Sequence, residues 1–83
     1  MTHLTEQQVV QFVQLMEQVK DRFWERTGRS PESVQGDWHY PRIKIQHADN
    51  AGFWNRDLTA AELSAQDLAP LAGAIIEEYQ RSP

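Results

Sequence analysis

Histidine is the side chain best suited to acid–base or metal chemistry near neutral pH, and this chain has three, far apart in the sequence. His3, His39 and His47 show neither the HxH nor the HxxxH spacing that brings two imidazoles to one metal ion. Asp37 and His39 would lie on the same side of an extended segment, where they could hold a metal ion or form an Asp–His pair. Two ligands without a third make a poor metal site, so we expect no metal and no cofactor.

The patterns of nucleophilic and phosphate chemistry are also incomplete. The chain has no cysteine, and Ser30, Ser33, Ser64 and Ser82 stand where serines cap helices or in the C-terminal tail. No G-x-S-x-G motif is present, and the four glycines stand singly, so no glycine-rich loop could cradle a phosphate. A chain of 83 residues leaves no room for a two-walled cleft between paired carboxylates. We therefore expect that the protein is not an enzyme.

Length and composition limit the class of protein. We expect residues 1–83 to form a single domain, because 83 residues suffice for one hydrophobic core. The 40% hydrophobic and 24% charged residues are typical of a folded globular chain. The sequence has no apolar run long enough to cross a membrane, and residues 1–6 lack the pattern of a secretory signal. These features predict a cytoplasmic protein without a membrane partner.

The first element that would position side chains is an amphipathic helix from about residue 6 to residue 26. Its apolar residues recur at the spacing of one helix face; they are Val9, Phe12, Val13, Met16, Val19 and Phe23. Val10, Leu15 and Trp24 widen this apolar arc, so that it could pack against two elements, or against one element and a partner. Thr5 with Gln8 predicts a capping box at its start.

The second element is an antiparallel β-hairpin over about residues 40–58. Alternation of apolar and polar residues around Ile43 indicates a strand, and residues 49–52 carry a turn signal. A symmetric turn would pair Lys44 with Asp57 on the polar face. Residues 29–36 are interpreted as a connection that begins with a short helical turn and ends at Gly36.

The third element is a second amphipathic helix over about residues 67–81. Its apolar stripe consists of Leu68, Leu71, Ala72, Ile75, Ile76 and Tyr79. Pro70 fits only its first turn, and a short separate turn is expected after Thr59. Together these elements predict an α+β fold: a small αββα domain in which the hairpin packs against the two helices.

Charge and aromatic residues are distributed unevenly over these elements. Residues 57–83 hold five acidic residues and one basic residue, whereas residues 36–56 hold three basic and two acidic residues and half of the phenylalanine, tryptophan and tyrosine residues. Tryptophan, tyrosine and arginine are the residues in which protein interfaces are enriched. The predicted interaction surface consists of Trp24, Trp38, His39, Tyr40, Arg42, Lys44 and Arg56. In the alternative interpretation, Trp24 and some of the hairpin aromatics close the core.

These observations favour a small non-catalytic module that binds a protein, as an adaptor, an inhibitor or a structural subunit. We expect it to self-associate as a dimer, through the hairpin edge or the broad arc of the first helix. Two other functions stay open. The aromatic hairpin with Arg42, Lys44 and Arg56 could bind single-stranded nucleic acid weakly, or the acidic last helix could inhibit a basic nucleic-acid-binding protein.

Lys20 departs from its surroundings, because it falls among apolar residues of the first helix. Such a lysine can extend along apolar surface to reach water. It could instead meet a carboxylate of Glu62, Glu77 or Glu78, or face a partner.

Overall fold

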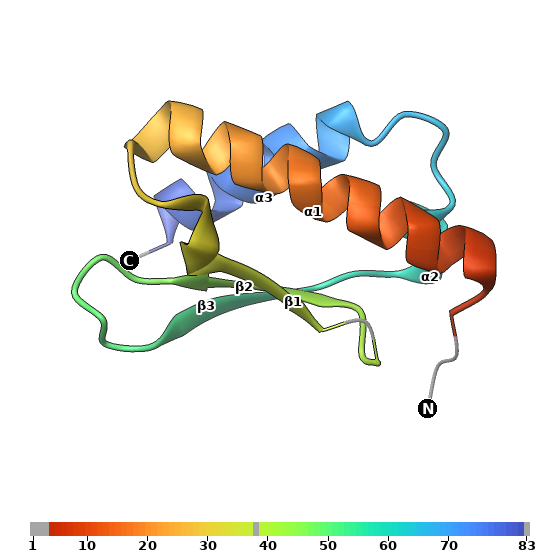
Figure 1. The fold of residues 1–83 in the computed structure, drawn as a ribbon, viewed down its shortest axis with the longest axis horizontal. Helices are drawn as coiled ribbons and strands as arrows, with labels where there is room; N and C mark the ends of the chain where they lie inside the picture. Colours follow the sequence, from red (N-terminus) through yellow and green to blue (C-terminus); the bar gives the residue numbers. More distant parts are fainter. Residues whose placement is uncertain (1–3, 38, 83) are drawn as a thin grey trace.

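The computed structural model describes residues 4–37 and 39–82 (Figure 1). The elements in chain order are α1 (Glu6–Thr27), the 3₁₀ turn η1 (Pro31–Ser33), β1 (Val34–Asp37), β2 (Arg42–Gln46), β3 (Phe53–Asp57), α2 (Ala60–Leu63) and α3 (Ala69–Arg81). Within the described residues, the strands form one antiparallel sheet in the order β1-β2-β3.

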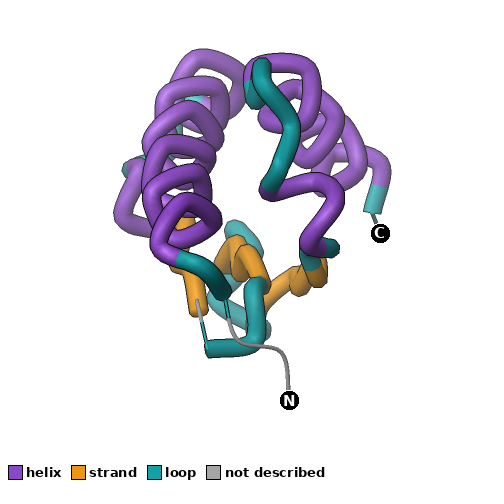
Figure 2. The backbone as a smooth tube through the Cα atoms, turned by 90° about the vertical axis from the view of Figure 1, so that its right-hand side faces the viewer, coloured by secondary structure: helices purple, strands orange, loops and turns teal. Residues whose placement is uncertain are grey.

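The molecule has two layers. Helices α1 and α3 lie side by side over one face of the sheet, as the view along the helices shows (Figure 2). Among the residues that the structure describes, no helix covers the opposite face of the sheet (Figure 1). This arrangement confirms the predicted α+β fold, in which antiparallel strands pack against two amphipathic helices.

Strand β1 is a part of the sheet that the sequence pattern does not predict. It spans Val34–Asp37, and its first three residues belong to the segment for which the sequence indicates only a connection. They pair antiparallel with β2, and Val34 lies opposite Ile45 while Asp37 lies opposite Arg42. So short a strand with a single buried apolar residue has no clear alternation of its own. Strand β1 forms because its backbone can pair with the edge of β2 and because α1 packs on β1.

Gly36 permits the close packing of α1 on β1; the prediction that it ends the segment is wrong. A Cβ atom at Gly36 would lie 2.8 Å from Cζ of Phe12 and 2.9 Å from Sδ of Met16. Such distances are shorter than any ordinary van der Waals contact, so a side chain at this position would force the ends of the Phe12 and Met16 side chains to move.

The register between β2 and β3 differs by two residues from the predicted one. Asp57 lies opposite Arg42, not Lys44. The ladder continues to His47, whose N–H donates to the Gly52 carbonyl, so the loop spans residues 48–51 and its centre lies one residue earlier than in the symmetric turn expected from sequence. Asn50, with φ of 57°, takes the left-handed conformation within it. A shift of two residues leaves each side chain on its predicted face.

The core lies between the two layers. Its buried residues come from α1, β1, β2, α2, α3 and the segments beside them: Phe12, Leu15, Met16, Val19, Phe23, Val34, Ile43, Ile45, Leu58, Leu63, Leu68, Ala72, Ile75 and Ile76. Strand β3 contributes the partly buried Trp54.

The starts of α1 and α2 follow the predicted capping patterns. Both hydrogen bonds of a capping box join Thr5 and Gln8, and Thr59 with Glu62 forms a second box at α2.

Val13, expected on the buried arc of α1, is exposed instead, because α3 packs on the Leu15 side of α1 and draws the buried arc toward that side.

Candidate interaction surface

The predicted surface residues lie in several separate places. Trp24 is near the C-terminal end of α1, with 55% of its surface exposed. His39 and Tyr40 are in the β1–β2 turn, where Tyr40 is 59% exposed. This turn and the C-terminal end of α1 lie at opposite ends of the molecule (Figure 1). Trp38 falls outside the described residues. The aromatic residues around the β1–β2 turn and Trp24 therefore do not make one patch.

Arg42 and Lys44 lie on the uncovered face of the sheet. Arg42 donates from Nε to Oδ1 of Asp57 at 2.7 Å, and both side chains of this ion pair are exposed. The ammonium of Lys44 lies 5.6 Å from the ring centroid of Phe53, the geometry of a cation–π contact. Asp37 is the neighbour of Arg42 on the other side, in β1. Acidic and basic groups thus balance on this face.

Arg56 occupies the opposite, helix-covered side of the sheet. Its Nη1 lies 2.8 Å from Oε1 of Glu62, and its Nε lies 3.4 Å from Oε1 of Glu78. It also donates to the Asp57 carbonyl at 2.8 Å. Arg56 therefore connects β3 to α2 and to α3. It has a structural role, although its side chain is partly exposed.

The pKa values of this group follow from the same contacts. The hydrogen bond with Glu62 raises the pKa of Arg56 against the opposing effect of burial, with a further contribution from Glu78. The hydrogen bond from Arg56 lowers the pKa of Glu62, which also accepts the Thr59 N–H. Both groups are accordingly held in their charged forms.

Lys20 is half-buried on α1. Two of the carboxylates proposed for it from sequence, those of Glu62 and Glu78, are engaged by Arg56. Among the described residues, no ion pair of Lys20 is formed. Its placement is consistent with a stem that lies along apolar surface and an ammonium that reaches water.

An aromatic cluster at the 47–52 loop is a feature that the sequence does not reveal. The ring of Tyr79 packs edge-on against Phe23 and Trp54, at centroid distances of 5.8 and 5.7 Å, and stacks with His47 at 6.1 Å. Arg29 donates to the Tyr79 hydroxyl at 2.7 Å and covers the Phe23 ring. These residues come from segments far apart in the sequence, so the spacing of neighbouring residues could not predict the cluster.

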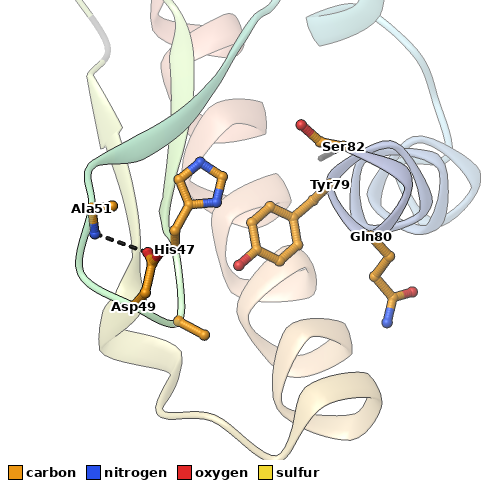
Figure 3. A pocket seen from close by; sticks show the side chains of 7 residues that line it. His47, Asp49, Ala51, Tyr79, Gln80 and Ser82 are labelled. Carbon is orange, nitrogen blue, oxygen red and sulfur yellow. Dashed lines mark hydrogen bonds between the residues drawn. The ribbon is translucent and has the colours of Figure 1, made fainter.

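A shallow hollow of about 540 Å³ opens beside this cluster, lined by His47, Asp49, Tyr79, Gln80 and Ser82 together with two alanines (Figure 3). Several of its polar groups bind the protein's own backbone. The Tyr79 hydroxyl lies 3.3 Å from the Gln46 carbonyl, and Asp49 accepts the Ala51 N–H at 3.0 Å. The arrangement closes one end of the core.

The described part of the chain holds neither a cluster of metal ligands nor a membrane-spanning helix. Across residues 4–37 and 39–82, no three side chains of histidine or acidic type converge on a common point. The Asp37 carboxylate accepts the backbone N–H of His39 at 3.0 Å, so it stabilises the turn. In the same residues, none of the helices combines the length and the apolar composition needed to cross a bilayer.

The exposed apolar residues of α1 form the clearest candidate for a contact surface. Val10, Val13 and Trp24 are each exposed over half of their surface or more. At about 100° per residue, they fall on one flank of the helix. Gln11 donates to the Ala65 carbonyl on the opposite flank, which α2 and α3 occupy. These three residues therefore lie on the side of α1 that faces away from α3.

Comparison of the chain with models of protein families, with curated proteins and with solved structures found no match.

Proposed function

We propose that this protein is a non-catalytic module that binds another protein chain, in the cytoplasm and without a cofactor, and that it self-associates. The exposed flank of α1 carries this proposal. The buried core of the described residues is filled without Val10, Val13 and Trp24. Exposed apolar residues in one line, with a tryptophan among them, are typical of a surface that a partner covers.

The balance of charges on the sheet favours protein binding over the nucleic-acid alternative. Arg42 and Arg56 are paired with carboxylates, which leaves Lys44 as the hairpin cation without an ion pair among the described residues. Binding to a phosphate backbone depends on cations that are free to replace counterions. The acidic-inhibitor alternative is weakened in a similar way, because Glu62 and Glu78 are engaged by Arg56.

The test compares wild-type protein with a variant in which Val13 and Trp24 are both replaced by alanine. Each protein is immobilised and used to capture partners from an extract, and each is run in sedimentation experiments over a range of concentrations. We expect wild type to retain itself or a defined partner, and the variant to lose that interaction while keeping its helical circular dichroism. Equal capture and equal sedimentation of the two proteins would contradict the proposal.

A labelled single-stranded oligonucleotide at low salt tests the alternative. If Lys44→Ala abolishes binding of the oligonucleotide and the α1 variant retains it, nucleic-acid binding would take the place of protein binding as the proposed function.

A further inference from the structure

Helix α1 carries a second residue pattern besides the stripe that it buries. Positions 10, 13, 17, 20, 24 and 27 are separated alternately by three and four residues, which is the spacing of the a and d positions of a coiled-coil seam. The residues at these positions are Val10, Val13, Glu17, Lys20, Trp24 and Thr27. Each is exposed or half-buried. We refer to them as the α1 seam.

The α1 seam is distinct from the buried stripe. Phe12 and Met16 point toward Gly36 of β1, and Gln11 points toward Ala65 before α3. The seam therefore lies on the flank of α1 beyond β1 and away from α3. Figure 2 shows α1 and α3 side by side above the sheet, and no other helix of the described part of the chain lies along the outer flank of α1.

The order of residues along the seam is self-complementary. Valines stand toward its N-terminal end, a tryptophan stands toward its C-terminal end, and Glu17 and Lys20 stand in the middle. In an antiparallel helix pair, the a positions of one helix face the d positions of the other. A two-fold axis between Glu17 and Lys20 then places Glu17 opposite Lys20 of the partner subunit, and Trp24 opposite Val13 of the partner subunit. Symmetry repeats each pair.

The charges also select the orientation. In a parallel pair in register, Glu17 would face a second Glu17 and Lys20 a second Lys20, which places like charges opposite each other twice. In the antiparallel pair, both contacts join opposite charges, and Lys20 gains the carboxylate that its own chain does not supply among the described residues.

We propose that the α1 seam binds a second copy of this chain, with the two α1 helices antiparallel and paired through Glu17 and Lys20. This inference rests on the proposed function, since it names the partner of the same surface. A helix of 22 residues is about 33 Å long, and one pair of helices buries an area at the low end of specific interfaces. The dimer is accordingly expected to dissociate on dilution.

The central test is a charge exchange followed by sedimentation equilibrium. Glu17→Lys alone and Lys20→Glu alone each place like charges opposite one another, so each should weaken the dimer about tenfold or more. The double variant Glu17→Lys/Lys20→Glu restores opposite charges and should dimerise nearly as well as wild type. Glu77→Lys, an exposed charge reversal on α3, is the matched control and should leave the dimer unchanged.

A single introduced thiol tests the orientation, because the chain has no cysteine of its own. In the antiparallel pair, position 13 faces position 24 of the other copy, so the two copies of position 13 would be separated by about 16 Å along the helices. Val13→Cys should therefore form no intermolecular disulfide under mild oxidation, since a disulfide requires Cα atoms within about 7 Å. Rapid and complete cross-linking would overturn the antiparallel arrangement.

The remaining outcomes are also decisive. Wild-type protein that stays monomeric up to near-millimolar concentration would overturn the dimer, and so would a dimer that all charge variants form equally well. Neither result would contradict protein binding as such, which fails only if the Val13 and Trp24 double variant captures every partner that wild type captures. Circular dichroism of each variant verifies that the seam substitutions leave the fold intact.

Discussion

At Gly36, the absence of a side chain leaves room for the ends of the Phe12 and Met16 side chains. The Cβ atom of an alanine there would lie within 3.0 Å of both Phe12 and Met16. We expect Gly36→Ala to destabilise the protein by about 1–3 kcal/mol, as overpacking of a core typically does. Urea denaturation followed by tryptophan fluorescence measures this difference.

Gly73 provides the matched control for this substitution. It lies inside α3, and a Cβ atom there would meet no described atom within 4 Å. Gly73→Ala should therefore stabilise the protein by about 0.5–1 kcal/mol through helix propensity. Equal effects of the two substitutions would show that the space above Gly36 is not limiting.

The Glu62 carboxylate makes stability depend on pH with a definite sign. Its pKa is lowered in the folded protein, chiefly by the hydrogen bond from Arg56. The stabilisation is therefore complete above the pKa of the unfolded chain and is lost as the pH falls through the lower folded pKa. Between pH ~7 and pH ~3, Glu62→Gln should lose less stability than wild type. The comparison of urea midpoints checks this, and equal losses would contradict it.

At the scale of elements, Arg56 ties β3 to two helices, whereas Arg42 joins two neighbouring strands in solvent. The Arg56 and Glu62 side chains are 21% and 25% exposed, and those of Arg42 and Asp57 are 43% and 76% exposed. We expect Arg56→Met to destabilise the protein by about 1–3 kcal/mol, because it leaves Glu62 and Glu78 without their partner. Arg42→Met should change stability by less than about 1 kcal/mol. Thermal unfolding of both variants distinguishes the two roles.

At the scale of the whole molecule, two adjacent aromatic residues face different environments. Phe23 is fully buried between the layers, while Trp24 is on the open flank of α1. Phe23→Ala should cost about 3–5 kcal/mol of stability. Trp24→Ala should cost less than about 1 kcal/mol and should instead reduce association. Denaturation and sedimentation of each variant separate these effects, and a large loss of stability in Trp24→Ala would assign it to the core.

Local sequence is sufficient for the parts of the fold that a short segment determines. The start of α1 follows from the Thr5 and Gln8 capping box, and its end follows from Gly28, which takes the left-handed conformation at φ of 69°. Pro70 correctly limits the start of α3, which begins at Ala69, two residues later than expected. The inward face of β2, with Ile43 and Ile45, follows from simple alternation.

The candidate surface is less accessible from sequence. Their residue types place both Trp24 and Arg56 in the predicted interaction surface. The structure, however, pairs Arg56 with Glu62 and Glu78, which come from later helices. Residue type indicates what a side chain can bind, whereas only packing decides whether its own chain already supplies the partner. The line of Val10, Val13 and Trp24 is a surface only because α3 occupies the other flank of α1.

The sequence alone determined the helices, the capping boxes of α1 and α2, the faces of the hairpin and the absence of any complete catalytic motif. Tertiary structure decided that Val34–Asp37 is a strand, that Asp57 lies opposite Arg42, and that Arg56 connects β3 to α2 and α3. The physical reason is how far apart in the sequence the interacting residues lie. Periodicity and capping depend on residues within a few positions of one another. Pairing at a sheet edge, register and burial depend on partners brought together from distant segments, such as Gly36 under Phe12.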